Sequence, residues 1–172
     1  MMESKTNATT NAIEIACGIE RRGIGLYRRA SMMAADDESR ELFLRMMEEE
    51  RQHLRYFESL RDCGDADQSD ETTVSLASAL ASEAYLPGGL MQMAYEGAFT
   101  SREAMLDSMI QAENDSIVYY EQLIKQIIEQ LAQPASGDED GQWSKTLNQR
   151  RDQLSNILEQ ERAHLAELHG WR

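Results

Sequence analysis

The chain has 172 residues, and its 31 acidic and 17 basic residues give a net charge of −14 at pH 7. This length suits a single domain built around one hydrophobic core. A surface this acidic repels the phosphate backbone of nucleic acids, so we expect no nucleic-acid partner.

The cysteine content and the hydropathy exclude further classes of protein. The 2 cysteines, Cys17 and Cys63, are too few for a disulfide scaffold or a four-cysteine metal site, and they favour a reducing compartment. The sequence has no run of about 18 apolar residues, and its polar start lacks the apolar stretch of a secretory signal. We therefore expect a cytoplasmic protein that does not interact with membranes.

The first half of the chain predicts two long helices and a connection. Apolar residues recur every three to four positions over residues 11–35, which is typical of one helix face. The pair Asp36-Asp37 can cap a second helix that continues to about residue 61. The acidic segment 62–72 predicts a loop. Residues 73–86 predict a short helix that ends at Pro87-Gly88-Gly89, and residues 90–98 predict another turn or two of helix.

The second half predicts two more long helices. Thr100 and Glu103 form a capping box for the third helix, which runs to about residue 131. Residues 133–141 predict a loop, and the fourth helix spans about residues 142–168. Four amphipathic helices bury their apolar faces most simply as a bundle. We therefore expect an all-α four-helix bundle in one domain, 1–172, with residues 62–100 as a helical connection.

Charged residues interrupt the apolar face of every long helix. Each helix carries one glutamate at a core-facing position, and two histidines follow such a glutamate by three positions, which places both side chains on one face. These six residues are Glu20, Glu50, His53, Glu113, Glu161 and His164. Four buried carboxylates would repel one another, so a cation must compensate them. Two divalent ions would balance the charge, and these ligand types suit iron, manganese and zinc.

Other polar residues near this pattern have simpler interpretations. Tyr27 and Tyr120 are either ordinary core tyrosines or donors of hydrogen bonds to ligand carboxylates. Glu48 and Glu49 fall off the apolar face, which predicts a solvated surface. His169 has no glutamate three residues before it and is expected at the surface.

Four stretches of the sequence resemble the rubrerythrin-like branch of the ferritin superfamily. They are AIEIACGIERRGIGLY, LFLRMMEEERQHLRYFESL, MLDSMIQAENDSIVYY and LSNILEQERAHLAEL. They share with that branch a paired Glu-x-x-His and, in the alternate helices, a glutamate seven residues before a tyrosine. The resemblance implies a ferritin-like four-helix bundle with a dinuclear iron site.

The resemblance also implies roles for the individual residues. Glu50 and Glu161 would bridge the two metals. Glu20 with His53, and Glu113 with His164, would be terminal ligands. Which histidine binds which metal is left open. Tyr27 and Tyr120 match tyrosines that hydrogen-bond to the ligands in that family. By the same resemblance we expect a homodimer.

Two departures from the family pattern matter. The chain carries no rubredoxin domain with its two Cys-x-x-Cys pairs, so the electrons must come from a separate donor protein. Rubrerythrins also place an extra glutamate three residues after the ligand of the third helix, where this chain has Ser116. The family's peroxidase cycle, in which a metal shifts between ligands, is therefore not assured here.

The leading hypothesis is an oxidoreductase that reduces hydrogen peroxide or O₂ at two iron ions, with manganese or zinc as other metals that this ligand set accepts. Three alternatives remain. They are an iron-handling protein with ferroxidase or storage activity, a dimanganese catalase-like enzyme, and a non-enzymatic helical module that binds metal.

Overall fold

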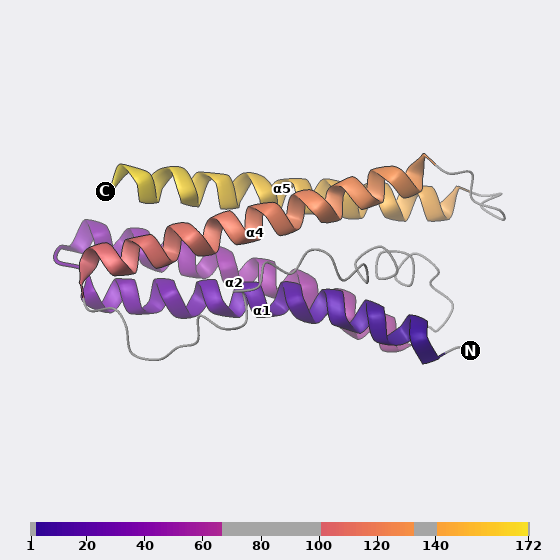
Figure 1. The fold of residues 1–172 in the computed structure, drawn as a ribbon, viewed down its shortest axis with the longest axis horizontal. Coiled ribbons are helices and arrows are strands. Elements are labelled where there is room, and N and C mark those ends of the chain that lie inside the picture. Colours follow the sequence, from indigo (N-terminus) through magenta and orange to yellow (C-terminus); the bar gives the residue numbers. More distant parts are fainter. Residues whose placement is uncertain (1–2, 67–100, 133–140, 172) are drawn as a thin grey trace.

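Four long helices make up the described part of the chain. The computed structural model describes residues 3–66, 101–132 and 141–171. Its helices are α1 (Glu3–Met33), α2 (Asp37–Ala66), α4 (Arg102–Leu131) and α5 (Gln142–Gly170). These segments contain no strand, and their helices lie along one common direction (Figure 1), so the predicted all-α four-helix bundle is confirmed.

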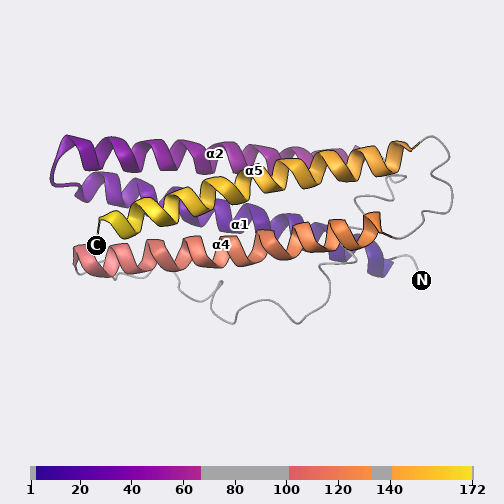
Figure 2. The same cartoon turned by 90° about the horizontal axis from the view of Figure 1, so that it is seen from above.

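The helices form two antiparallel pairs. α1 packs mainly on α2 and α4 mainly on α5, while α1 also contacts α4 and α2 contacts α5. α2 and α4 begin at the same end of the bundle, and α1 and α5 run in the opposite direction (Figures 1 and 2). This arrangement brings one helix face from each of the four elements to a shared interior.

The start of α2 agrees with its predicted cap. The Asp36 carboxylate accepts hydrogen bonds from the backbone N–H and the hydroxyl of Ser39, both at 2.7 Å. These two bonds, formed to the ionised carboxylate, hold the pKa of Asp36 below its ordinary value. Asp37 and Glu38 in the first turn add negative charge where the helix dipole favours it.

Several other helix boundaries differ from the prediction. α1 already begins at Glu3, because helices extend readily from a formed turn into a polar segment that shows no apolar pattern. For the same reason α2 continues to Ala66, so the loop predicted from residue 62 is wrong in its first residues. Ser101 caps α4 by accepting from the N–H of Ala104 at 3.2 Å, so the capping box placed at Thr100 is wrong by one residue.

The last helix begins where it was predicted. Gly141 precedes α5 with a φ of +67°, a backbone conformation that glycine adopts without strain. α5 then extends slightly beyond the predicted end, to Gly170. The short helices predicted within residues 73–98, and most of the loop at residues 133–141, lie outside the described residues.

The hydrophobic core has two parts. One cluster includes Cys17, Phe57, Tyr120 and Leu154, and the other includes Tyr27, Phe43, Met46, Met109 and Leu168. Several methionines therefore fill the core, as their flexible side chains allow, and Cys17 is a fully buried core residue. A buried polar layer of glutamates and histidines lies on the same helices, between the sequence positions that form the two clusters.

None of the described helices combines the length with the apolar stretch that crossing a bilayer requires.

Candidate metal centre

The six residues predicted as metal ligands lie together in the buried polar layer. Each of the four helices contributes one glutamate, and α2 and α5 each add a histidine one turn later. None of the six side chains is more than 3% exposed. Their ligand atoms form two groups of four, and within each group the atoms lie within 4.8 Å of one another. The described structure thus contains a cluster that could hold a metal ion.

The two groups share two carboxylates. The first group contains Glu20 and His53, the second contains Glu113 and His164, and Glu50 and Glu161 belong to both. The geometry therefore pairs Glu20 with His53 and Glu113 with His164, the same pairing that the resemblance implied. That these residues bind metal stays a prediction.

The shared carboxylate of Glu50 faces both histidines. Its Oε2 lies 3.6 Å from Nδ1 of His53, and its Oε1 lies 3.3 Å from Nδ1 of His164. Nδ1 of His53 is also 3.4 Å from Oε2 of Glu20 and 3.0 Å from Oε1 of Glu161. One oxygen of Glu50 therefore points to each group, which is the arrangement that a bridging carboxylate needs.

Hydroxyl groups hold the outer oxygens of three carboxylates. Tyr27 on α1 donates a hydrogen bond to Oε1 of Glu113 on α4, and Tyr120 on α4 donates to Oε1 of Glu20 on α1. Ser116 donates to Oε2 of Glu161 at 3.2 Å. Of the two interpretations of the tyrosines, the structure therefore shows hydrogen bonding to the candidate ligands.

The tyrosine hydroxyls are held in their protonated form. Burial raises the pKa of both phenols well above the ordinary value, and nearby glutamate charges raise it further. Tyr27 and Tyr120 therefore stay hydrogen-bond donors across the physiological pH range. Each orients one terminal carboxylate so that its other oxygen faces the cluster.

The outer nitrogens of the histidines also have partners. Nε2 of His53 lies 2.8 Å from Oε1 of Gln160, and Nε2 of His164 lies 2.7 Å from Oε2 of Glu49. A carboxylate or amide oxygen accepts a hydrogen bond and does not donate one, so Nε2 carries the hydrogen on both rings. In the neutral ring, this fixes the tautomer in which Nδ1 offers a lone pair to the cluster.

Glu49 is a correction to the sequence analysis, which placed it on a solvated surface. Glu49 lies outside the apolar face of α2, but it lies beside α5, where its carboxylate contacts Nε2 of His164. Glu48 behaves as predicted, because its side chain is 49% exposed and pairs with Arg51 and Arg55. His169 is exposed, as predicted.

Five inward-facing atoms of the cluster form no hydrogen bond of normal geometry, although two of them, Nδ1 of His53 and Oε1 of Glu161, lie 3.0 Å apart. They are Oε2 of Glu20, Nδ1 of His53, Oε2 of Glu113, Oε1 of Glu161 and Nδ1 of His164. Buried polar atoms are nearly always paired, and leaving one unpaired costs about 1–3 kcal/mol. All five are lone-pair donors of the kinds that iron, manganese and zinc accept. The residues present therefore fit a bound divalent metal.

The charges in the cluster shift the pKa values of its members. Burial raises the pKa of Glu20 and Glu161 well above the ordinary value, and the neighbouring charge of Glu50 raises both further. Burial also opposes ionisation of Glu50, but its interactions with Glu20 and the two histidines outweigh this and hold its pKa low. The raised pKa values favour the protonated, neutral form of Glu20 and Glu161, which lowers the negative charge of the cluster.

The pKa values of the two histidines also depend on burial and on the neighbouring carboxylates. Burial alone would lower the pKa of each imidazole, but the surrounding carboxylates outweigh it. They raise the pKa of His53 well above its ordinary value and that of His164 to about 11. A metal that binds must displace these protons.

Gly23 is a residue of the site that the sequence analysis did not single out. A Cβ added there would lie 2.9 Å from Cδ and 3.1 Å from Oε2 of Glu50. The absence of a side chain on α1 thus leaves room for the shared carboxylate. In the sequence, this role could have been inferred from a glycine inside a helix, one turn after Glu20. Glycine at such a position costs about 1 kcal/mol of stability relative to alanine.

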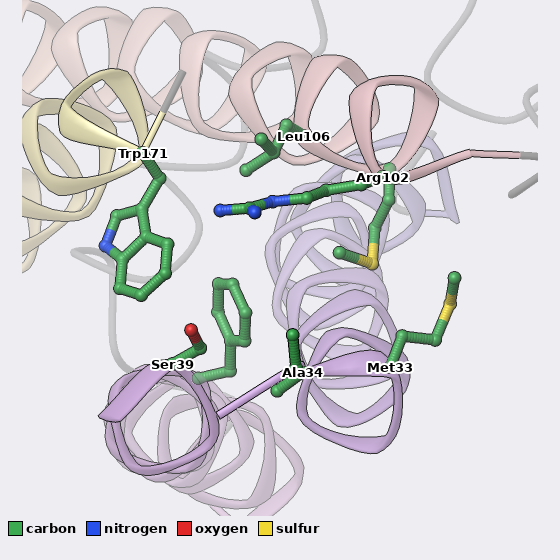
Figure 3. A pocket seen from close by; sticks show the side chains of 9 residues that line it. Met33, Ala34, Ser39, Arg102, Leu106 and Trp171 are labelled. Carbon is green, nitrogen blue, oxygen red and sulfur yellow. The ribbon is translucent and has the colours of Figure 1, made fainter. Parts of the chain in front are cut away.

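A separate pocket lies at one end of the bundle, where the turn between α1 and α2 meets the start of α4 and the end of α5 (Figure 3). The guanidinium of Arg102 lies over the ring of Trp171, with its central carbon 5.7 Å from the ring centroid. Phe43 lines this pocket and stacks on Tyr27 at 6.5 Å. The pocket contains none of the six candidate ligands.

Comparisons with protein-family models, with curated proteins and with solved structures found no match. The resemblance to rubrerythrins therefore stays a prediction from the sequence. The case for the metal centre depends on the geometry described above.

We expect Gly23→Ala to weaken metal binding by about tenfold or more, because the new methyl group takes the space of the Glu50 carboxylate and support of a ligand is typically worth 10–100-fold. A Zn²⁺ titration against a competing chelator measures the loss. Gly18→Ala is the matched control on α1, since its added Cβ meets no atom within 4 Å. Equal affinity of both variants would contradict the role of Gly23.

We expect metal affinity to fall as the pH falls. The pKa values of Glu20, Glu161 and both histidines are raised, so protons compete with the metal for these groups and are released where a metal displaces them. Each released proton lowers the affinity by about tenfold per pH unit of acidification. Calorimetric Zn²⁺ titrations in two buffers of different ionisation enthalpy measure the release. An affinity independent of pH would contradict it.

Proposed function

We propose that this protein binds two divalent metal ions, iron in the native state, and acts as a rubrerythrin-type oxidoreductase that reduces hydrogen peroxide or O₂. The observation that carries the proposal is the pair of four-residue groups that share Glu50 and Glu161. Two ions of charge +2 balance the four carboxylates, and they supply partners for the five inward atoms that form no hydrogen bond.

The proposed reaction with peroxide is balanced by two electrons and two protons, which convert one H₂O₂ into two molecules of water. When bound, a pair of iron ions supplies these two electrons to the oxidant. A separate redox protein would then return them. This donor is the partner that the proposal requires.

The residues of the chain prepare the site for this chemistry. The two shared carboxylates would help to hold both metals, and the two tyrosines hold the terminal carboxylates in place through their outer oxygens. The apolar clusters of the core contribute buried side chains from all four helices and keep bulk water from the polar layer. Such a dry, fixed set of charges needs little rearrangement when electrons are transferred.

Ser116 bears on the form that the reaction takes. It occupies the position of the extra rubrerythrin glutamate, and its hydroxyl donates to Glu161 instead of offering a further carboxylate. We therefore propose that each metal keeps the same protein ligands throughout the reaction. The same fixed ligand set would also serve a dimanganese catalase-like enzyme, which is the second candidate.

We expect about two metal ions per chain in protein reloaded anaerobically with Fe²⁺, and almost none in the double variant Glu50→Ala/Glu161→Ala, because it lacks both shared carboxylates. Elemental analysis measures the metal, and circular dichroism checks that the variant stays helical. Glu48→Ala/Glu159→Ala is the matched control, because both residues lie on the same helices but are exposed. Two ions per chain in the first variant would refute the assignment.

We expect peroxide to oxidise the iron-loaded protein faster than O₂ does, with one H₂O₂ consumed per two Fe²⁺. Stopped-flow absorbance measures both rates. Release of O₂ from peroxide by manganese-loaded protein would favour the catalase-like candidate instead. Uptake of far more than two irons by a large closed shell would favour storage, whereas the proposal expects a homodimer. Slow oxidation by both oxidants would leave only a non-enzymatic metal-bound role.

A further inference from the structure

The candidate centre consists of two similar halves, one on α1 and α2 and the other on α4 and α5. α1 and α4 each carry a glutamate followed seven residues later by a tyrosine, and α2 and α5 each carry a glutamate followed three residues later by a histidine. The tyrosine of each half donates to the glutamate of the other half. Within the ligand set and its tyrosines, the two halves are therefore chemically alike.

The support of the two histidines breaks this equivalence. The residue directly before each shared glutamate contacts the histidine of the other half, and these residues are Glu49 and Gln160. His164 thus donates to a carboxylate at 2.7 Å, whereas His53 donates to an amide oxygen at 2.8 Å. The carboxylate is also better shielded from solvent, because the Glu49 side chain is 24% exposed whereas Gln160 lies at the exposed surface.

A carboxylate acceptor changes the imidazole more than an amide does. Hydrogen bonds to an ionised acceptor are about twice as strong as those between neutral groups. The carboxylate raises the basicity of the opposite ring nitrogen and adds a negative charge close to the metal position. Arg45 offsets this charge only weakly, since its contact to Glu49 is 3.5 Å long while its contact to Glu167 is 2.6 Å.

Two other differences between the halves act on shared carboxylates and on neither histidine. Gly23 lies against Glu50, and Ser116 donates to Glu161. Both therefore act on carboxylates that belong to both groups. The carboxylate of Glu49, by contrast, acts on His164 only, because His53 has the amide of Gln160 in the same place.

We propose that the two metal positions are inequivalent, and that the position of Glu113 and His164 binds a divalent cation more tightly because Glu49 supports its histidine. The inference rests on the proposed dinuclear site and deepens it. It makes Glu49 and Gln160 positioning residues that set the order of filling. A protein with a single bound metal would therefore carry it at the His164 position.

Zn²⁺ is the probe, because it binds this ligand set without redox chemistry. Protein labelled with ¹⁵N-histidine has only 3 histidines, and the exposed His169 serves as the internal reference. During titration of chelator-stripped protein, the ring signals of His164 should change during the first equivalent and those of His53 during the second. Competition with a chelator should give two stepwise affinities that differ by more than the statistical ratio.

Three variants test the cause of the inequivalence. Glu49→Gln should weaken the tight step by about tenfold or more and bring the two steps together, because both histidines then have amide support. Gln160→Glu should strengthen the weak step by a similar factor. The double exchange E49Q/Q160E should reverse the order, so that His53 responds first. Structural damage alone would not produce this reversal.

The outcomes separate this inference from the proposed function. Absence of Zn²⁺ binding to the wild type would overturn the dinuclear site itself. Binding of two ions with both histidines responding together in the wild type, or an unchanged order in the double exchange, would overturn the inequivalence and leave the dinuclear site standing.

Discussion

The rest of the structure depends on the neutralisation of four carboxylates buried in one layer. Their mutual repulsion and their lost hydration oppose the packing of all four helices, so the bundle closes only with positive charge between them. Protons on Glu20, Glu161 and the histidines can supply part of this charge, as the raised pKa values show. Metal ions would supply all of it, and would also pair the atoms that the protons leave without partners. Metal binding, as proposed, would therefore stabilise the bundle.

The hydrogen bonds around the ligands also join the two helix pairs. The tyrosines connect α1 with α4, and the contacts of Glu49 and Gln160 connect α2 with α5. These helix pairs pack less extensively than the two hairpins α1–α2 and α4–α5 do internally. The polar layer thus fixes the register between two hairpins, and that register decides which oxygen of Glu50 faces which histidine. The geometry of the site and the docking of the hairpins depend on each other.

The sequence predicted the features that follow from helical periodicity. Glutamates and histidines at apolar positions identified the six buried residues, because a charge on a buried face is rare enough to be informative. The start of α1 and the end of α2 were missed, because polar segments continue a helix without an apolar pattern. Gly23 and Glu49 were missed for another reason. Their roles depend on which residue of a neighbouring helix lies opposite them, and periodicity along one helix does not contain that information.

The contrast between the buried candidate ligands and the residues at the edge of the layer explains where the two halves of the centre can differ. The buried ligands are constrained by charge balance, so substitution of one of them would leave a carboxylate or an imidazole without compensation. Glu49 and Gln160 lie at the edge of the layer, where either a carboxylate or an amide can reach solvent and still accept from a histidine. An exchange at this edge would change the strength of one candidate ligand without disturbing the packing of the core. A symmetric bundle can therefore acquire two unlike metal positions at residues that, in the sequence, resemble ordinary surface positions.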